Sequence, residues 1–268
     1  NFLSVFLNQQ ANEFFDWSTC LLLGQVQTDD LQSLSYASSG QSASIERLRE
    51  LCSTLDERVE SVLKPVFDLD FEVIVIGGGH NNAYPIVSAL SQSTTQRVAC
   101  SNLDPHADFR PMEGRHSGNP FRYAYERDYL GHYCVLGLHE QKNNQATLDG
   151  LHQADFPYFS FQSIFMSSSL TIDVAIRRAA EYIEQADTPC GVELDLDAIK
   201  FAGASAYSVA GFSLEQAMSY VYRLAVCPNT RYLHLCEGAP IGESNDTGQQ
   251  LTQLVYSFVR ARTRVDWH

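Results

Sequence analysis

The sequence predicts an α/β protein of three layers, α/β/α, built on a mostly parallel sheet of seven or eight strands. Short apolar, β-branched runs alternate along the chain with longer segments whose apolar residues recur at helical spacing. Strands that alternate with helices in this way form βαβ units, and their right-handed crossovers place helices on both faces of the sheet. Several runs end directly in His, Asp or Glu, as expected where parallel strands bring ligand-binding groups to one sheet edge.

The expected strands are short runs rich in leucine, valine, isoleucine and aromatic residues. They comprise residues 18–25, 71–76, 97–103, 132–138, 158–160, 190–196 and 231–236. These seven segments lead us to expect a sheet of seven or eight strands.

The expected helices carry apolar residues three or four positions apart. They span residues 45–63, 81 or 82 to about 90, 145–152, 170–186, 214–224 and 248–261. Asn81 or Asn82 is suited to cap the second of these, because an asparagine side chain can accept a hydrogen bond from the free amides of a first turn. We expect residues 33–44 to be an exposed loop and residues 109–131 to be irregular, since the latter contain several Pro and Gly.

The chain has the size and composition of one domain spanning residues 1–268. It has 268 residues, of which 44% are hydrophobic, enough for one large core. No Pro/Gly/Ser-rich linker, internal repeat or low-complexity tract divides it. We expect residues 1–16 to form an N-terminal arm or helix.

Charge and cysteine usage limit the partners. The formal net charge is −14, and such a surface repels phosphate backbones, so nucleic acid is not an expected partner. No apolar run reaches the length of a membrane span, so no membrane partner is expected. The seven cysteines form no C-x-x-C pair and mostly lie in apolar runs, which is typical of free thiols in a reducing compartment. The first ten residues lack a signal-peptide pattern, and we expect a cytoplasmic protein.

The central motif is a run of alternating metal-capable side chains after the strand at 97–103. Asp104, His106 and Asp108 are spaced two apart, so on extended backbone they point to the same side. One imidazole between two carboxylates suits Mn, Fe, Zn or Mg. The alternative is a polar loop whose carboxylates cap a helix.

Three further strand ends carry candidate ligands. His80 follows three glycines after one strand, Asp195 and Asp197 end another, and Glu237 follows a third. Each alone has an ordinary explanation: a phosphate-cradling turn or loop histidine at His80, and helix caps at the two aspartates. Together, two His and four Asp can build a two-metal centre, in which the ions share a water and lower its pKa towards neutrality.

These motifs resemble one family in order and spacing. The residues are GGGH at 77–80, DPHADFRP at 104–111, D-x-D at 195–197 and the late Glu237. The arrangement resembles the ureohydrolases, the arginase/agmatinase/formimidoylglutamase superfamily, over roughly residues 70–240. HSGNPFR at 116–122 makes the chain most similar to the formimidoylglutamase branch. The resemblance implies an arginase-like fold.

The resemblance also implies two manganese ions per chain, although other divalent metals could take their place. His80 and Asp108 would hold one ion, His106 and Asp197 the other, and Asp104 and Asp195 would bridge the two. As implied catalytic residues, Glu237 would hold the cationic amidine of the substrate, and Asp108 would move a proton to the leaving amine.

Substrate choice depends on other residues. Arg110 is suited to clamp a carboxylate of the substrate, and the alternative is a surface arginine paired with Glu113. Ser117 and Asn119 match positions that contact the amino-acid end of the substrate in arginases, whereas Phe121 stands where arginases carry a histidine. Two departures from the family pattern are Glu193, where a serine is usual, and the loop at 200–208, which has no proline.

The expected activity, implied by the resemblance, is hydrolysis of N-formimidoyl-L-glutamate to L-glutamate and formamide, a step of histidine degradation. One alternative keeps the chemistry with another guanidino substrate, such as agmatine or a guanidino acid. A second alternative, motivated by the altered 200–208 loop, is a divergent homologue that binds metal and ligand without turnover. The partner would be a small molecule, and a homo-oligomer is compatible with the family.

Overall fold

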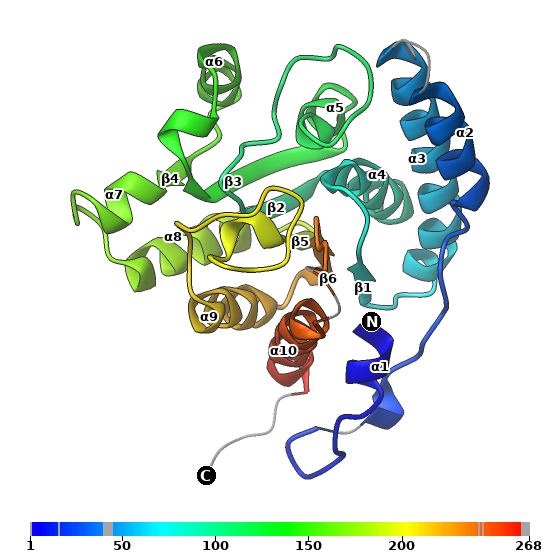
Figure 1. The fold of residues 1–268 in the computed structure, drawn as a ribbon. Coiled ribbons are helices and arrows are strands. Elements are labelled where there is room, and N and C mark those ends of the chain that lie inside the picture. The colour runs from blue at the N-terminus through cyan, green and yellow to red at the C-terminus, as the bar shows by residue number, and fades with distance from the viewer. Residues whose placement is uncertain (1, 16, 40–44, 241, 243, 264–268) are drawn as a thin grey trace.

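Six parallel strands form one sheet in a computed structural model of the chain, which describes residues 2–15, 17–39, 45–240, 242 and 244–263 (Figure 1). The strand order is β1-β6-β5-β2-β3-β4, and every neighbouring pair is parallel. The strands are β1 Val73–Ile76, β2 Val98–Leu103, β3 Leu130–Leu138, β4 Tyr158–Ser160, β5 Cys190–Asp195 and β6 Thr230–Cys236.

Helices cover both faces of this sheet. They are α1 Phe2–Phe6, α2 Asp29–Ser39, α3 Ile45–Asp68, α4 Ala83–Thr94, α5 Pro120–Glu126, α6 Gln145–Gln153, α7 Phe161–Phe165, α8 Ile172–Gln185, α9 Leu214–Ala225 and α10 Asp246–Arg262. One core cluster packs α8, α9 and α10 on one face, and a second packs α3, α4, α5 and α6 on the other. The predicted α/β/α class is confirmed. Within the described ranges every helix is too short or too polar to cross a bilayer.

Local sequence explains where several helices begin. The side chains of Asn144, Ser160, Thr171 and Ser213 each accept a hydrogen bond from the backbone amide three residues later. Such caps satisfy amides that a first turn otherwise leaves free. The two strongest apolar stripes, on α8 and α9, face the sheet, because burial of one face stabilises a helix of this length more than propensity does.

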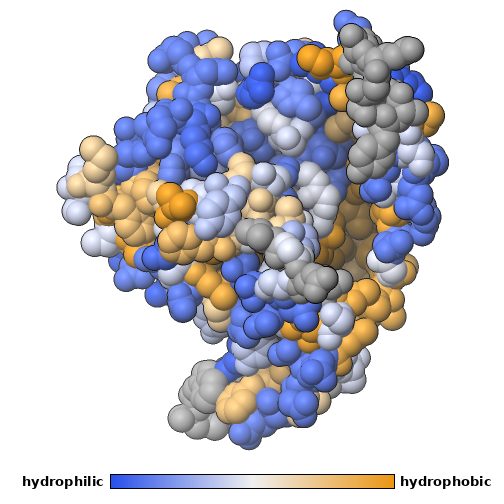
Figure 2. Space-filling view, viewed as in Figure 1, coloured by the Kyte–Doolittle hydropathy of each residue, from blue (hydrophilic) through white to orange (hydrophobic). Residues whose placement is uncertain are grey.

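The predicted count of seven or eight strands is wrong, because residues 18–25 do not join the sheet. After a 3₁₀ turn at Trp17–Thr19 this segment has no regular structure, and Leu21, Leu22 and Leu23 are exposed. Figure 2 shows hydrophobic residues on this face beside β1 and the extended segment between α1 and α2. A cavity of about 900 Å³ lies between residues 23–28 and β1, so the apolar run lacks the hydrogen-bonding partner that defines a strand.

Three other expectations about local structure need correction. Residues 33–39 are part of α2 rather than a loop, since Asp29 and Asp30 in its first turn favour a helix start; residues 40–44 lie outside the described residues. The segment 109–131 is not irregular throughout, because Pro120 begins helix α5 at a position where proline is well tolerated. Asn82 does precede α4, but its side chain makes no capping bond and instead donates to the Gly77 carbonyl.

Candidate metal centre

Neighbouring strands deliver the candidate ligands to one edge of the sheet. Strands β1, β6, β5 and β2 lie side by side, and each ends in polar residues at its carboxyl end. In chain order these residues are His80, then Asp104, His106 and Asp108, then Asp195 and Asp197, and last Glu237. Ligands of open α/β sheets bind at this edge because side chains from several strand ends converge there.

The first group gathers around the His80 ring, which is fully buried. Its Nδ1 lies 2.8 Å from Asp108 Oδ2, 3.1 Å from Asp104 Oδ2 and 3.7 Å from Asp195 Oδ2. One ligand atom from each of these four residues lies within 4.8 Å of the others. Within the described part of the chain, neither ring nitrogen of His80 makes a hydrogen bond.

The second group consists of His106, Asp195 and Asp197, whose ligand atoms also lie within 4.8 Å of one another. Asp195 belongs to both groups, so its carboxylate lies between them. Asp104 connects them as well, because its Oδ1 lies 3.4 Å from His106 Nδ1 while its Oδ2 faces His80. The two groups therefore have the composition and the shared carboxylates of a dinuclear site.

Strained backbone holds two of the acidic residues. Asp108 and Glu237 have φ values of 46° and 59°, in the left-handed region that side chains other than glycine seldom adopt. Such conformations persist where surrounding contacts fix them, which is frequent at functional sites. For Glu237 those contacts are hydrogen bonds from its amide to the Gly78 carbonyl, 2.9 Å, and from the His80 amide to its Oε1, 2.7 Å.

The electrostatics of the site favour a cation. Burial and the neighbouring Asp104 carboxylate raise the pKa of Asp108 to about 6, and the same causes raise the pKa of Asp195 well above its usual value. Burial acts to lower the pKa of His106, but contact with Asp104 outweighs it and raises that pKa to about 9. These shifts reflect carboxylates crowded out of water with too little positive charge between them. Divalent cations would supply that charge, and the oxygen and imidazole ligands fit manganese.

A cavity of about 650 Å³ opens onto both groups. Its lining includes the acidic residues Asp108, Asp195, Asp197 and Glu237 together with His106. Ser205 and Ala206 of the 200–208 loop also line it, and the Ala206 amide donates to Asp197 Oδ1, 2.9 Å. The cavity is thus lined by several acidic residues and bordered by the 200–208 loop.

The cavity also contains two basic side chains, Arg110 and Lys142. Arg110 is half exposed and donates to Glu113 Oε1, 2.9 Å, so the pairing named as the alternative for this residue is present while Arg110 also lines the cavity. Lys142 is absent from the site residues that the sequence predicts. Following the strand at 132–138 to its carboxyl end, as for the other strands, would have indicated the segment that contains it.

The structure separates two residues that were predicted together. Ser117 is exposed and lines the cavity. Asn119 is fully buried and does not line it: its side chain accepts from Arg115 and donates to the carbonyls of Pro111 and Gly114. Asn119 therefore shapes the loop that presents Ser117.

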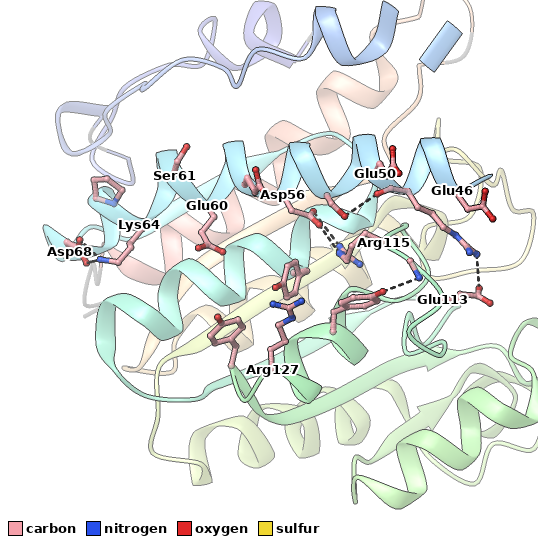
Figure 3. Close-up of a pocket in the computed structure, with 18 residues that line it drawn as sticks. Glu46, Glu50, Asp56, Glu60, Ser61, Lys64, Asp68, Glu113, Arg115 and Arg127 are labelled. Atoms are coloured by element: carbon pink, nitrogen blue, oxygen red, sulfur yellow. Dashed lines mark hydrogen bonds and ion pairs between the residues drawn. The ribbon is translucent and has the colours of Figure 1, made fainter. Parts of the chain in front are cut away.

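Arg115 fastens that loop to the helices beneath it. Its guanidinium donates to Asp56 of α3 at 2.7 Å (Figure 3). It also donates to the Asn81 carbonyl at 2.9 Å and lies over the rings of Tyr84 and Tyr123. Both members of the ion pair are almost completely buried. Since Asn81 directly follows His80, this contact links the position of the loop to that of a candidate ligand.

Further residues near the centre come from positions with no ligand motif. Asn143 accepts from the Ala107 amide at 2.8 Å and donates to the Pro105 carbonyl at 3.0 Å, holding the segment between Asp104 and Asp108. Phe121 is buried with its ring edge-on to His80 and stacked on Tyr133. An apolar ring is thus packed against His80.

Comparison with protein families gives one match over nearly the whole chain. A family model described as the arginase family matches residues 7–260. Among curated proteins, the formimidoylglutamase of Geobacillus thermodenitrificans is 30% identical over 193 residues, which cover 69% of this chain and 57% of that protein. The formimidoylglutamase of Rhodococcus jostii is 26% identical over 217 residues, covering 75% and 66%. The matched part of the chain thus covers between just over half and about two thirds of the length of these relatives.

Solved structures share the fold. The formimidoylglutamase of Bacillus subtilis has a TM-score of 0.72 at 18% identity, covering 79% of this chain and 68% of that one. The Trypanosoma cruzi formiminoglutamase crystallised with Mn²⁺ has a TM-score of 0.70 at 20% identity, covering 79% and 72%. At these identities the likeness concerns the arrangement of the strands and helices.

Proposed function

The chain belongs to the arginase family, and on that premise we propose that it is a binuclear manganese hydrolase that converts N-formimidoyl-L-glutamate and water to L-glutamate and formamide. The observation that carries this proposal is the polarity of the cavity, which is lined by buried aspartates and, nearer the solvent, by the exposed Arg110 and Lys142. A substrate with a cationic amidine at one end and carboxylates at the other matches both parts. The relatives named formimidoylglutamase support the same substrate.

His80, Asp104, Asp108 and Asp195 would hold one manganese ion, and His106, Asp195 and Asp197 the other, with Asp104 completing the bridge. When bound, the two ions would activate water at neutral pH. The Trypanosoma cruzi formiminoglutamase crystallised with Mn²⁺, which has the same fold, supports this choice of metal.

The protein side chains would orient the substrate and move its protons. Glu237, fixed by the His80 amide, would hold the amidinium group through its remaining carboxylate oxygen. Asp108 would carry a proton to the leaving nitrogen. Arg110, Ser117 and Lys142 would bind the amino-acid end, with Asn119 shaping the loop.

Several broader predictions belong to the same proposal. We propose that residues 1–268 act as one domain, that the substrate is the main partner, and that copies of the chain can associate. All seven cysteines are free, which supports a reducing compartment such as the cytoplasm.

The test is turnover of N-formimidoyl-L-glutamate by purified, manganese-loaded protein, followed by formamide release, with agmatine and arginine assayed in parallel. Selective turnover of the first compound is the expected result. Turnover of agmatine alone would favour the alternative guanidino substrate. Two bound manganese ions with no turnover of any of the three would favour a homologue that binds without catalysis.

A further inference from the structure

Directly beneath the metal ligands, three adjacent strands carry a row of buried polar side chains. Asn102 on β2, Glu193 on β5 and His234 on β6 are paired in register and have no exposed surface. Each lies two residues before a position at or just past the end of its strand, so it shares a face with the residue above it. We call Asn102, Glu193 and His234 the polar layer.

Glu193 lies at the centre of the polar layer, and each of its carboxylate oxygens has a hydrogen-bonding partner. Its Oε1 accepts from the Tyr232 hydroxyl at 2.6 Å, and its Oε2 lies 2.6 Å from His234 Nδ1. The same Oε2 lies 3.5 Å from Nε2 of His80, the ring nitrogen that does not face the aspartates. Gly191 leaves room for the Tyr232 ring that holds Glu193, because a Cβ at this position would lie 2.1 Å from the ring.

The other members of the row support a similar role for the layer. The Asn102 amide donates to Asp104 Oδ2 at 3.0 Å, so it holds a second candidate ligand from below. Because buried polar groups are costly unless they are paired, a row of three across the centre of a sheet calls for a functional explanation.

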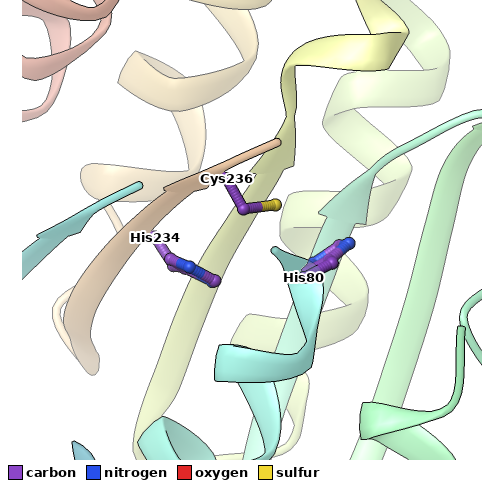
Figure 4. Close-up of side chains that lie close together, drawn as sticks. All are labelled: His80, His234 and Cys236. Carbon is purple, nitrogen blue, oxygen red and sulfur yellow. The ribbon is translucent and has the colours of Figure 1, made fainter. Parts of the chain in front are cut away.

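His234 and Cys236 project from β6 on the same side as His80, and with His80 they form a further group of possible ligand atoms (Figure 4). His234, however, already contacts Glu193 through Nδ1, and His80 directs Nδ1 to the aspartates. We therefore interpret this cluster as support for His80 rather than as a separate metal site.

We propose that Glu193 is a positioning residue: its Oε2, 3.5 Å from His80 Nε2, would accept a hydrogen bond from Nε2–H once His80 binds the metal, and would so direct His80 Nδ1 at the metal. A histidine that binds metal through one nitrogen commonly donates its other N–H to a carboxylate, which fixes the ring orientation and tautomer. His234 and Tyr232 hold Glu193 in the required place. This inference rests on the metal site of the proposed function and adds a role for the glutamate that departs from the family pattern.

The experiment measures manganese binding by calorimetry to wild-type protein, Glu193→Gln, His80→Ala and the double variant. Glutamine keeps the size of the side chain but removes its charge, and we expect the affinity of one manganese ion to fall 10- to 100-fold. In the His80→Ala background the same substitution should change affinity less than threefold, because the residue through which Glu193 acts is gone. An equal effect in both backgrounds, or no effect in either, would overturn the inference.

Tyr220→Phe is the control for general packing around Glu193. It removes a buried hydroxyl that contacts Ser101 and the backbone carbonyl of Glu193 but not the Glu193 carboxylate. It should leave manganese affinity unchanged; a loss equal to that of Glu193→Gln would assign the effect to general packing and refute the inference.

If Glu193→Gln does not fold, His234→Gln tests the inference instead, since it leaves the Glu193 carboxylate but removes the imidazole that holds Oε2. The affinity for one manganese ion should fall at least threefold, and an unchanged affinity would overturn the inference. If the wild-type protein binds two ions but turns over no substrate, only the proposed substrate is refuted. If it binds no manganese, both proposals are refuted.

Discussion

Arg110 gives the sharpest test of substrate recognition. We expect Arg110→Ala to lower kcat/KM for N-formimidoyl-L-glutamate while leaving any turnover of agmatine, which has no carboxylate, nearly unchanged. A hydrogen bond to a charged group contributes about 1.5–3 kcal/mol, which corresponds to roughly a 10- to 100-fold loss. The side chain is 51% exposed, so solvent screening places the expected loss near the lower end of this range.

Little free energy is lost when Arg110 leaves Glu113 to bind the substrate. Its pair with Glu113 is exposed on both sides, and such pairs contribute less than about 1 kcal/mol. Glu113→Gln should therefore preserve activity or raise affinity slightly. Arg49→Ala is the control, because Arg49 also faces Glu113, at 3.5 Å, but does not line the metal cavity.

The assay is steady-state formamide release for each variant, with KM and kcat determined separately. A clamp that acts on binding raises KM most. Equal losses on agmatine and N-formimidoyl-L-glutamate, or the same loss in Arg49→Ala, would refute the reasoning.

Three further predictions concern the metal centre and its support. Asp195→Asn should weaken the binding of both manganese ions, since Asp195 belongs to both ligand groups. Metal analysis after desalting should then find well under two manganese ions per chain. Manganese affinity should rise by at least about tenfold per pH unit between about pH 6 and 9, because His106, with a pKa near 9 in the metal-free protein, and His80, whose pKa is also raised, must each release a proton to bind metal. Arg115→Met should lower the free energy of unfolding by about 3–5 kcal/mol in urea titrations, because it leaves the buried Asp56 carboxylate without its partner.

Each of these has a result that contradicts it. Two tightly bound manganese ions in Asp195→Asn would mean that this carboxylate is not shared. A manganese affinity that is flat across that pH range would mean that His106 is not a ligand. For the ion pair, Arg97→Met is the control, since Arg97 and Asp128 are exposed and should contribute less than about 1 kcal/mol; equal losses in both variants would reject the burial argument.

Much of the fold could be predicted because its signals are local. The helix that begins at Ile45 follows from apolar spacing, although it runs to Asp68 rather than to the predicted residue 63, and the strand at Val98–Leu103 follows from its apolar run. The segment 18–25 has the same apolar composition as a strand but finds no partner in the sheet, and pairing is a non-local event that composition does not encode. Helix α5 is missed by the same reasoning, because a proline indicates a helix breaker unless it occupies the first helical position, as Pro120 does.

The sequence by itself determined the ligand types of the candidate centre and the strand ends that carry them, because alternation along a strand and the direction of parallel strands follow from backbone geometry. Only the tertiary structure decided which side chains face the cavity. It buried Asn119 in a loop network, placed Lys142 on the cavity wall and set Glu193 beneath His80. These outcomes depend on strand order and register, which bring residues far apart in the chain within contact distance and which no short motif specifies.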